Sequence, residues 1–487
     1  MGQLADLDAA AAVFNWDQET LMPPGALNAR AETMAGLSSM SHSLMTQPST
    51  VSMAEEIRAN LEAMPDFEQG ILRCFLRDFD RLVKLPDELV RETAMAEALA
   101  GEAWKSARAN DNFAEFQPHL SKLIELKSRA AELFGYEGHK LDALMNLFEP
   151  GLTVATVDPV FARLKAGVSA MLDEVREHDQ PDDSYLTNAN VPGETQMRFA
   201  RDVAAKIGFD FNCGRLDLSA HPFCTNFSHS DVRLTTRVED DLRTCLFSVI
   251  HEAGHGMYEQ GIDPRYARSA AAGGVSMGIH ESQSLFWEDI VARSREFWQW
   301  LFPQFRDTYM DAGTTVDAEQ MYRAVNLVRP GLIRIAADEL TYHMHIILRY
   351  EIERSLFSGD LKVADIPALW NEKMREYLGI VPPNNALGCL QDVHWSFGGF
   401  GYFPSYSLGK LYAAMMWAQV QQDMPAVRSQ IAVGDFAPLL DWLRRNVHQY
   451  GRTRDSRRII TDIAGRDLTE RDYLAYMRAK IDDIYAA

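Results

Sequence analysis

Hydrophobic side chains recur every three or four positions along most of this chain, which is the spacing of one face of an α-helix. The stretch from 72 to 83 is typical, with apolar side chains at Leu72, Phe75, Leu76, Phe79, Leu82 and Val83. Because proline is unfavourable in the interior of a helix, prolines are predicted to divide the first 130 residues into helices with short breaks, at Pro23, Pro24, Pro48, Pro65 and Pro86. Such stripes more often form a buried core than a cofactor site.

The same spacing predicts further helices along the rest of the chain. Residues 180–193 contain two prolines and several Asp, Asn and Ser residues, so they are predicted to form a loop. From Lys410 to the end the pattern is again helical. We expect a helical hairpin over 120–148, broken near Gly135, and single helices over 153–177, 241–260, 276–301 and 333–357.

A short region before residue 241 follows a different pattern. Apolar and β-branched side chains alternate at Val232, Leu234, Thr236 and Val238, which predicts a strand with one buried face. Residues 223–227 are expected to pair with it across 228–230. The edge of this strand suits hydrogen bonding to an extended peptide, and a purely structural sheet is the alternative. The predicted fold is therefore mainly α: a single large helical domain over 1–487, with a small β-sheet beside a deep active-site groove.

Residues 387–409 are rich in glycine and aromatic side chains, too irregular for a helix and too apolar for a free loop. A segment that crosses an active-site cleft has this composition. His394 and Tyr406 lie in it, and both can donate hydrogen bonds to a tetrahedral intermediate or to a substrate carboxylate. Packing without a chemical role is the alternative for each.

The charge balance excludes some functions. The formal net charge of −21 leaves no basic surplus to neutralise phosphates, so nucleic-acid binding is not expected. No apolar stretch reaches the roughly 18 residues that a membrane span needs, so no membrane segment is expected. We interpret the five cysteines as reduced thiols of a cytoplasmic protein, because they are few, odd in number and lack a Cys-x-x-Cys pair.

The strongest chemical signal is His251-Glu252-Ala253-Gly254-His255, within the predicted helix 241–260. Asp240 or Asp241 can cap its start and Gly261 can end it. Residues four apart share one face of a helix, so the two imidazoles lie side by side and provide half of a tetrahedral zinc shell. Glu252 lies off that face, where it can act as general base towards a water molecule in the open position. A buried histidine pair bonded to backbone is the alternative.

A catalytic zinc site needs a third protein ligand. Glu281, in Gly278-Ile279-His280-Glu281-Ser282, is the favoured candidate, because a loop over 261–274 can bring the next helix back beside the histidine pair. His280 is its rival in the same turn. Gly254 and Gly256 disfavour the helix, which is understandable if another backbone or a ligand must come close.

These segments resemble the carboxypeptidase Taq family of metallocarboxypeptidases, with His251 to Gln260 followed by Gly278 to Ser284. Further segments follow that family's pattern in order: Trp16-Asp17-Gln18 with Met22-Pro23, His221-Pro222-Phe223, Asp231 to Thr235, Ile333 to Asp338 and Gly388 to Trp395. The resemblance spans nearly the whole chain.

The resemblance implies metal-dependent release of single C-terminal amino acids with broad side-chain tolerance, by a homodimer that acts on peptides. It assigns Arg334 to the terminal carboxylate, which a guanidinium can bind through two hydrogen bonds. His221 and Arg233 become candidate substrate contacts, although Arg233 is equally suited to an ordinary ion pair. Zinc and cobalt both accept this ligand set. The alternatives are a helical metallo-endopeptidase, a dipeptidyl carboxypeptidase, and a non-enzymatic binding protein with a structural metal.

Overall fold

Helices form most of the chain, as the hydrophobic spacing predicts. The computed structural model describes residues 1–487 apart from 188–189, 311–314 and 486–487. The helices before the sheet are α1 (Gly2–Thr20), α2 (Leu27–Thr46), α3 (Pro48–Asn60), α4 (Asp66–Val83), α5 (Asp87–Ala109), α6 (Phe113–Phe134), α7 (Lys140–Phe148), α8 (Val154–Val175) and α9 (Gly193–Ile207). Those after it are α10 (Leu242–Gln260), α11 (Met277–Leu285), α12 (Arg295–Tyr309), α13 (Ala318–Val325), α14 (Tyr342–Ser358), α15 (Ile366–Leu378), α16 (Pro404–Asp423), α17 (Val427–Ala432), α18 (Ala437–Asn446), α19 (Ser456–Ala464) and α20 (Arg471–Tyr485).

Prolines mark helix starts where the sequence predicted breaks. Pro48 occupies the first turn of α3, where a backbone N–H would have no hydrogen-bond acceptor within the helix, so the N–H that proline lacks is not missed. Pro65 and Pro86 precede α4 and α5 directly. Gly135 separates α6 from α7, as expected, with a φ of 87° that disfavours other residues.

The small sheet contains β1 (Gly214–Leu218), β2 (Cys224–Ser228) and β3 (Asp231–Thr236) in the order β1-β3-β2. The predicted hairpin is confirmed, because β2 pairs antiparallel with β3. The sequence did not predict β1, which pairs parallel with β3 and occupies its other side. The strand that leads to α10 is therefore central and has no free edge for a peptide, since its backbone groups are shared with both neighbours. Of the two alternatives for this strand, the structure supports the structural sheet.

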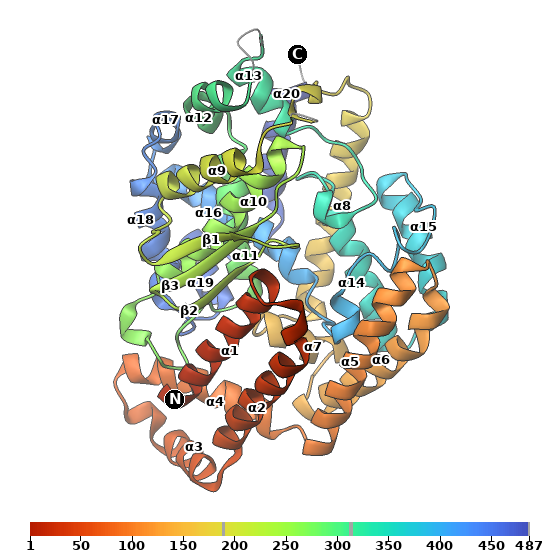
Figure 1. Ribbon diagram of the computed structural model, residues 1–487, viewed down its shortest axis with the longest axis vertical. Coiled ribbons are helices and arrows are strands. Elements are labelled where there is room, and N and C mark those ends of the chain that lie inside the picture. The colour runs from red at the N-terminus through yellow and green to blue at the C-terminus, as the bar shows by residue number, and fades with distance from the viewer. Residues whose placement is uncertain (188–189, 311–314, 486–487) are drawn as a thin grey trace.

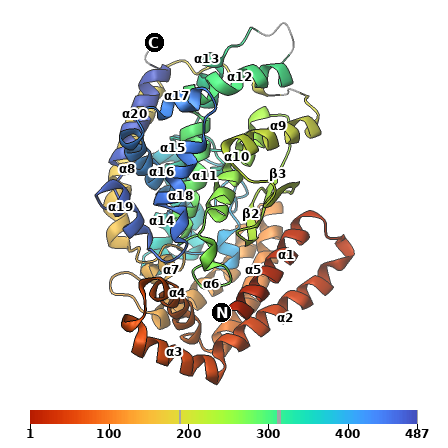
Figure 2. The ribbon, with the colours of Figure 1, turned by 90° about the vertical axis from the view of Figure 1, so that its left-hand side faces the viewer.

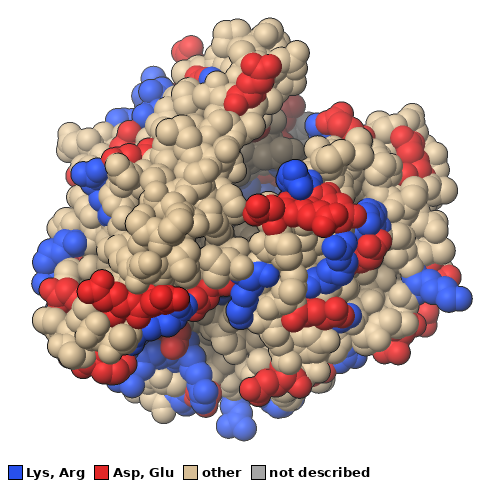
Figure 3. Space-filling model, turned by 90° about the horizontal axis from the view of Figure 1, so that it is seen from below, with Lys and Arg blue, Asp and Glu red and all other residues tan. Residues whose placement is uncertain are grey.

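The elements are arranged around this sheet. Figures 1 and 2 show the α1–α2 hairpin projecting from one side of the molecule, with the sheet between it and α10. Behind α10 lie α11 and α16, and the two chain ends lie at opposite ends of the molecule. On the face seen from below, basic and acidic side chains are interspersed around a hollowed centre (Figure 3). No helix in the described part of the chain is both long and apolar enough to cross a membrane.

Two predicted helices differ from the structure. The helix expected over 276–301 is α11 followed by a π-helix (Phe286–Ala292), and Ser294 then caps α12 through its Oγ. The helix expected over 333–357 begins only at Tyr342, because Asp338 accepts hydrogen bonds from Leu340 N and Thr341 N and turns the backbone.

As a result Arg334 lies in a short 3₁₀ turn (Arg334–Ala336), and it does not open the helix as predicted. Residues 404–409, predicted to be irregular, form the first turns of α16, which begins at Pro404. A proline in the first turn of a helix is favourable, so the aromatic segment ends several residues earlier than its composition suggests.

Candidate metal centre

The helix α10 presents two imidazoles on one face. Asp241 caps its start by accepting a hydrogen bond from Arg243 N, and Gly261 follows its end, as the sequence predicts. Within it, His251 and His255 lie one turn apart, with ring centroids separated by 4.9 Å. Both side chains come from one rigid helix, so their spacing does not depend on a loop.

Glu281 reaches this histidine pair from α11, which packs against α10. The ligand atoms of His251, His255 and Glu281 all lie within 4.8 Å of one another. His255 Nε2 and Glu281 Oε2 are 3.7 Å apart. Two ligands each about 2.1 Å from a tetrahedral zinc ion lie about 3.4 Å apart, so the residues present fit such an ion with little movement.

The close approach of the two helices depends on Gly254. A Cβ atom built there would lie 2.6 Å from both Gln283 O and Ser284 Cα. The expectation that another backbone comes close to Gly254 is therefore confirmed. On its far side, Glu281 lies against Gly409 of α16, where a Cβ atom would lie 2.5 Å from Glu281 Cγ.

The three side chains are partly open to solvent. The exposed fractions of the His251, His255 and Glu281 side chains are 21, 15 and 13%. A structural metal site is closed by four protein ligands, whereas a catalytic site keeps a position open. Among the described residues no fourth His, Cys, Asp or Glu joins this group. The arrangement therefore matches a catalytic site.

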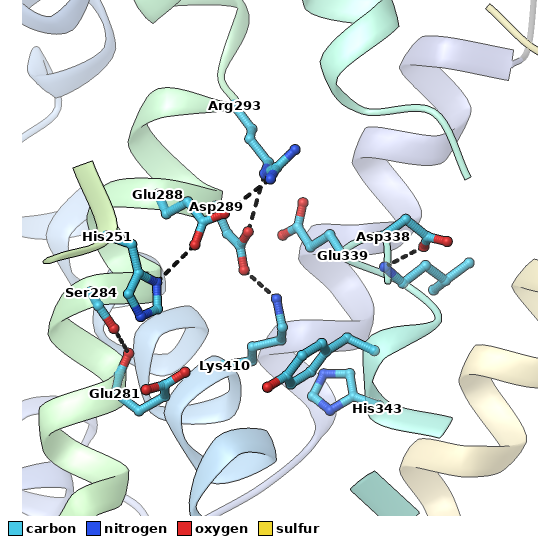
Figure 4. Close-up of polar contacts among 12 residues, drawn as sticks. His251, Glu281, Ser284, Glu288, Asp289, Arg293, Asp338, Glu339, His343 and Lys410 are labelled. Carbon is cyan, nitrogen blue, oxygen red and sulfur yellow. Dashed lines mark hydrogen bonds and ion pairs between the residues drawn. The ribbon is translucent and has the colours of Figure 1, made fainter. Parts of the chain in front are cut away.

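A buried charge network holds His251 in place. His251 Nδ1 hydrogen bonds to Glu288 Oε2 at 2.8 Å, which leaves Nε2 for a metal. Arg293 contacts Glu288 at 3.0 Å and Asp289 at 3.2 Å, and Asp289 in turn accepts a hydrogen bond from Lys410 (Figure 4). Glu288 is therefore fixed by a guanidinium as well as by the imidazole.

His280, the rival third ligand, occupies a different position. Its Nδ1 lies 2.7 Å from His255 Nδ1, and its Nε2 lies 2.8 Å from Glu259 Oε1. Both ring nitrogens are thus hydrogen bonded inside the protein. His280 does not belong to the group of converging ligand atoms, whereas Glu281 does.

The electrostatics of the site favour a cation. Burial lowers the pKa of His251, but the hydrogen bond to Glu288 and the carboxylates Glu281 and Glu252 outweigh it and raise that pKa to about 10. Burial, together with His280 and His251, holds the pKa of His255 well below its usual value, so its ring is neutral and has a lone pair to share.

Glu252 follows His251 on α10 and is 7% exposed. Burial raises its pKa to about 7; His251 opposes this rise, and Glu281 and Glu288 add to it. A carboxylate whose pKa lies near neutrality is suited to proton transfer at neutral pH. Its place next to a ligand, and not among the ligands, agrees with the helical spacing.

The aromatic segment brings His394 and Tyr406 together, with His394 Nε2 3.0 Å from Tyr406 Oη. Two further tyrosines, Tyr342 and Tyr402, lie close enough to Glu281 for its charge to act on them. Burial raises the pKa of each to about 12, and Glu281 adds to the rise. Neutral hydroxyl donors therefore surround one side of the centre.

Arg334 is buried beside these tyrosines. Its Nε donates to Asp392 Oδ1 at 2.9 Å, its Nη1 donates to Tyr342 Oη at 3.0 Å, and its guanidinium lies 4.7 Å from the centre of the Tyr406 ring. Its Nη2 donates to none of the described residues and is not enclosed by protein. One nitrogen of a fixed guanidinium is thus left for an external acceptor.

The structure places the two sheet candidates differently. Arg233, on β3, forms an ion pair with Asp231 at 3.0 Å and lies over the rings of Trp16 and Phe227. His221 is exposed in the loop before β2, where its carbonyl accepts a hydrogen bond from Ser219 Oγ. No hydrogen bond joins either side chain to the triad in the described ranges of the chain.

Sequence reasoning missed several residues of the site. Glu288 lies seven positions after Glu281, which is two turns in the continuous helix predicted over 276–301, so its spacing was a usable signal. Asp392 lies in the segment Gly388 to Trp395, which follows the family pattern. Its ion pairs with Arg334 and the buried Arg349 could not be predicted from the neighbouring sequence. Glu259, four residues after His255, shares the ligand face of α10 and could have been found in the same way.

Known proteins that are similar to this chain include metallopeptidases. A family model described as carboxypeptidase Taq (M32) metallopeptidase matches residues 1–481. Carboxypeptidase 1 of Bacillus subtilis (strain 168) is 36% identical over 485 residues, covering 99% of this chain and 97% of that protein. Thermostable carboxypeptidase 1 of Pyrococcus furiosus is 37% identical over 474 residues, covering 97% of this chain and 95% of that protein.

Solved structures show the same fold. The M32 carboxypeptidase from Deinococcus radiodurans R1 is 36% identical, with a TM-score of 0.96 over 100% of this chain and 98% of that chain. Metallocarboxypeptidase 1 of Trypanosoma cruzi is 34% identical, with a TM-score of 0.94 over 100% of this chain and 98% of that chain.

Proposed function

Because the chain belongs to the carboxypeptidase Taq (M32) family of metallopeptidases, it is a metal-dependent carboxypeptidase. We propose that it releases single amino acids from the C-terminus of peptides, with broad side-chain tolerance. The endopeptidase, dipeptidyl and non-enzymatic alternatives find no support in the family or its relatives. The observation that carries the proposal is Arg334, a buried guanidinium near the triad with one accessible nitrogen.

His251, His255 and Glu281 would hold the metal, which we propose to be Zn²⁺ or Co²⁺. When bound, such a cation acts as a Lewis acid that polarises a carbonyl and lowers the pKa of water. The ligand set of two imidazoles and one carboxylate suits both ions. Glu288 and Arg293 keep His251 turned so that its Nε2 faces the centre.

Glu252 is the proposed general base. From its position on α10, next to the ligand face, it takes a proton from the attacking water. It then delivers this proton to the leaving amine. Water reaches the centre because the triad is partly exposed, whereas Glu252 itself is buried.

His394 and Tyr406 are the proposed residues that stabilise the oxyanion of the tetrahedral intermediate. His394 Nε2 and Tyr406 Oη are 3.0 Å apart, so His394 would donate to the tyrosine oxygen and leave the Tyr406 hydroxyl to donate to the oxyanion. This contact holds both side chains before substrate arrives, so little reorganisation is needed during the reaction. Removing one donor of this kind typically costs about 100-fold to 1,000-fold in kcat.

Arg334 is the proposed binding site for the terminal carboxylate of the peptide. Asp392 and Tyr342 fix the orientation of the guanidinium, and Nη2 donates to the substrate. We also propose His221 and Arg233 as substrate contacts further along the peptide, because both lie in or beside the sheet that packs against α10.

The proposed assembly is a homodimer of peptidase subunits in the cytoplasm, each chain forming one domain. The odd, small number of cysteines, all five of them unpaired, supports a reducing compartment. Sedimentation velocity tests the dimer: a mass of twice 54.9 kDa is expected, and a single 54.9 kDa species contradicts it. Cell fractionation tests the compartment, with enzyme in a secreted or membrane fraction as the contrary result.

Mass spectrometry of a mixed peptide pool tests the function, with and without a chelator. Products shortened by one residue at the C-terminus are expected, and only in the sample without chelator. Each peptide is paired with its C-terminal amide, which lacks the carboxylate that Arg334 would bind. Equal cleavage of amide and free acid, or products two residues shorter, would overturn the proposal.

A further inference from the structure

The two imidazoles of the centre, His251 and His255, have different hydrogen-bond partners at their Nδ1 atoms. His251 Nδ1 hydrogen bonds directly to the carboxylate of Glu288. His255 Nδ1 meets a second imidazole, that of His280, at 2.7 Å, and His280 Nε2 meets Glu259 Oε1 at 2.8 Å. We call His255, His280 and Glu259 the relay. Glu259 lies one helical turn after His255 on α10, and His280 lies beside them on α11.

The surroundings of Glu259 fix the direction of these hydrogen bonds. Its carboxylate is 4% exposed and accepts from Asn226 Nδ2 of β2 at 2.8 Å and from Gly274 N at 3.1 Å. Asn226 Nδ2 and Gly274 N can only donate, since neither an amide nitrogen nor a backbone N–H accepts hydrogen bonds. Both oxygens of Glu259 are therefore acceptors. The hydrogen between His280 Nε2 and Glu259 Oε1 must then belong to His280 Nε2.

The tautomers of the relay follow from this direction. When the His280 ring carries one hydrogen, on Nε2, its Nδ1 is bare and can only accept. His255 must then donate from its own Nδ1, and its Nε2 is left bare. That bare nitrogen is the atom 3.7 Å from Glu281 Oε2, so the lone pair faces the centre. No other arrangement of hydrogens on the two neutral rings satisfies all three contacts.

The packing around the relay leaves it little freedom. Gly274 has no side chain, and a Cβ atom there would lie 2.6 Å from His280 Cδ2 and 2.8 Å from Tyr258 Cε1. The Tyr258 ring packs against His280 with centroids 5.1 Å apart, and Tyr258 Oη accepts a hydrogen bond from Val275 N. Three parts of the fold therefore position the His280 imidazole: the sheet, the loop that follows α10, and α11 itself.

We propose that His280 and Glu259 are positioning residues that hold His255 in the tautomer able to bind the metal. The proposal rests on the metal centre assigned under the proposed function. It gives the histidine of the Gly278-Ile279-His280-Glu281 motif a role of its own: Glu281 supplies a ligand atom, and His280 orients another. Partners of this kind typically change metal affinity by about 10-fold to 100-fold when they are replaced.

Metal affinity of the full-length protein tests the proposal, measured by competition with a chromophoric chelator and by the visible spectrum of the Co²⁺ form. His280→Leu removes the acceptor and is expected to weaken metal binding by about 10-fold to 100-fold. His280→Asn keeps an amide oxygen near the position of Nδ1, so affinity should return to within about threefold of the original. A loss in His280→Asn equal to that in His280→Leu, or no loss in either, overturns the proposal.

A double-mutant cycle tests the link to Glu259. Glu259→Gln should weaken metal binding by about 10-fold in the original chain and have no further effect in the His280→Asn background, because the imidazole that connects the two is gone. Equal effects in both backgrounds would show that Glu259 acts without His280.

His343→Leu is the control, because His343 is a buried histidine whose side-chain partner, Ser407 Oγ, lies outside the relay. It should lower stability without changing metal affinity. Glu281→Ala separates the two proposals: if it still binds metal, the assigned centre is wrong, whereas normal binding by His280→Leu alone contradicts only the relay.

Discussion

At the scale of single residues, the chemistry depends on where the helix places Glu252. It is next to His251 in sequence but about 100° away around the helix, so it lies beside the proposed ligands and not among them. This offset of one residue would give α10 two metal ligands and the proposed base without any contribution from a loop.

Glu252→Gln should therefore separate catalysis from metal binding. The amide keeps the shape of the side chain but cannot take a proton, so kcat/KM should fall by a factor on the order of 100 to 10,000. Metal content, measured by atomic emission, should stay at one ion per chain because Glu252 is not a ligand. Activity within threefold of the original enzyme would exclude Glu252 as the base.

At the scale of elements, the centre exists because α10 and α11 pack unusually closely. Gly254 lies at the contact, against the backbone of Gln283 and Ser284. A larger residue must push the two helices apart, and Glu281 moves with α11 while the two histidines stay on α10.

Gly254→Ala should consequently lower the free energy of unfolding by about 1–3 kcal/mol, as overpacking does elsewhere, and weaken metal binding as well. Urea denaturation and chelator competition measure the two effects. Gly36→Ala is the control, because a Cβ atom at this helical glycine meets nothing within 4 Å, and alanine there should stabilise α2 by up to about 1 kcal/mol. If both substitutions behave alike, the packing argument fails.

A second element-scale contact ties the aromatic segment to α14. The buried carboxyl of Glu353 accepts from Trp395 Nε1 and Gly401 N, both at 2.9 Å. Burial raises its pKa from 4.5 to about 8, against the opposing effect of these hydrogen bonds. The folded protein thus keeps a proton that the unfolded chain releases above pH 4.5.

The sign of the resulting pH dependence follows from linkage. The contribution of Glu353 is complete below pH 4.5 and is lost as the pH rises towards 8, at about 1.4 kcal/mol per pH unit. Glu353→Gln should remove this part of the slope, so the variant gains stability relative to the original chain between pH 5 and 8. Urea midpoints at several pH values measure the difference. A difference that does not change with pH would mean that Glu353 is ionised in the fold.

At the scale of the whole molecule, the metal should link the helices that supply its ligands. Any ligand that binds only the folded state stabilises it, by about 2.7 kcal/mol at a free concentration of 100 times Kd. A chelator should therefore lower Tm, and added Zn²⁺ or Co²⁺ should restore it. Glu281→Ala should show neither change. If neither chelator nor added metal changes Tm, the proposed metal site between α10 and α11 is contradicted.

Local patterns in the sequence determined most of the helices, the hairpin of β2 and β3, and the positions of the candidate residues on α10. They did so because hydrogen bonds within a helix fix the spacing of residues four apart, whatever surrounds the helix. The positions of His251, Glu252 and His255 on α10 follow from this spacing alone. Spacing along the chain also pointed to Glu281 as the third ligand, but it left the adjacent His280 open, and the packing of α11 separates the two residues.

Tertiary packing alone decided the rest. The parallel pairing of β1 with β3, the bridge of Asp392 between two arginines and the placement of His280 behind His255 join segments far apart in the chain. Nothing in the local sequence encodes such pairs, because they depend on how helices approach one another. Gly254 connects the two levels: its lack of a side chain is visible in the sequence, but its effect appears only when α11 lies against it.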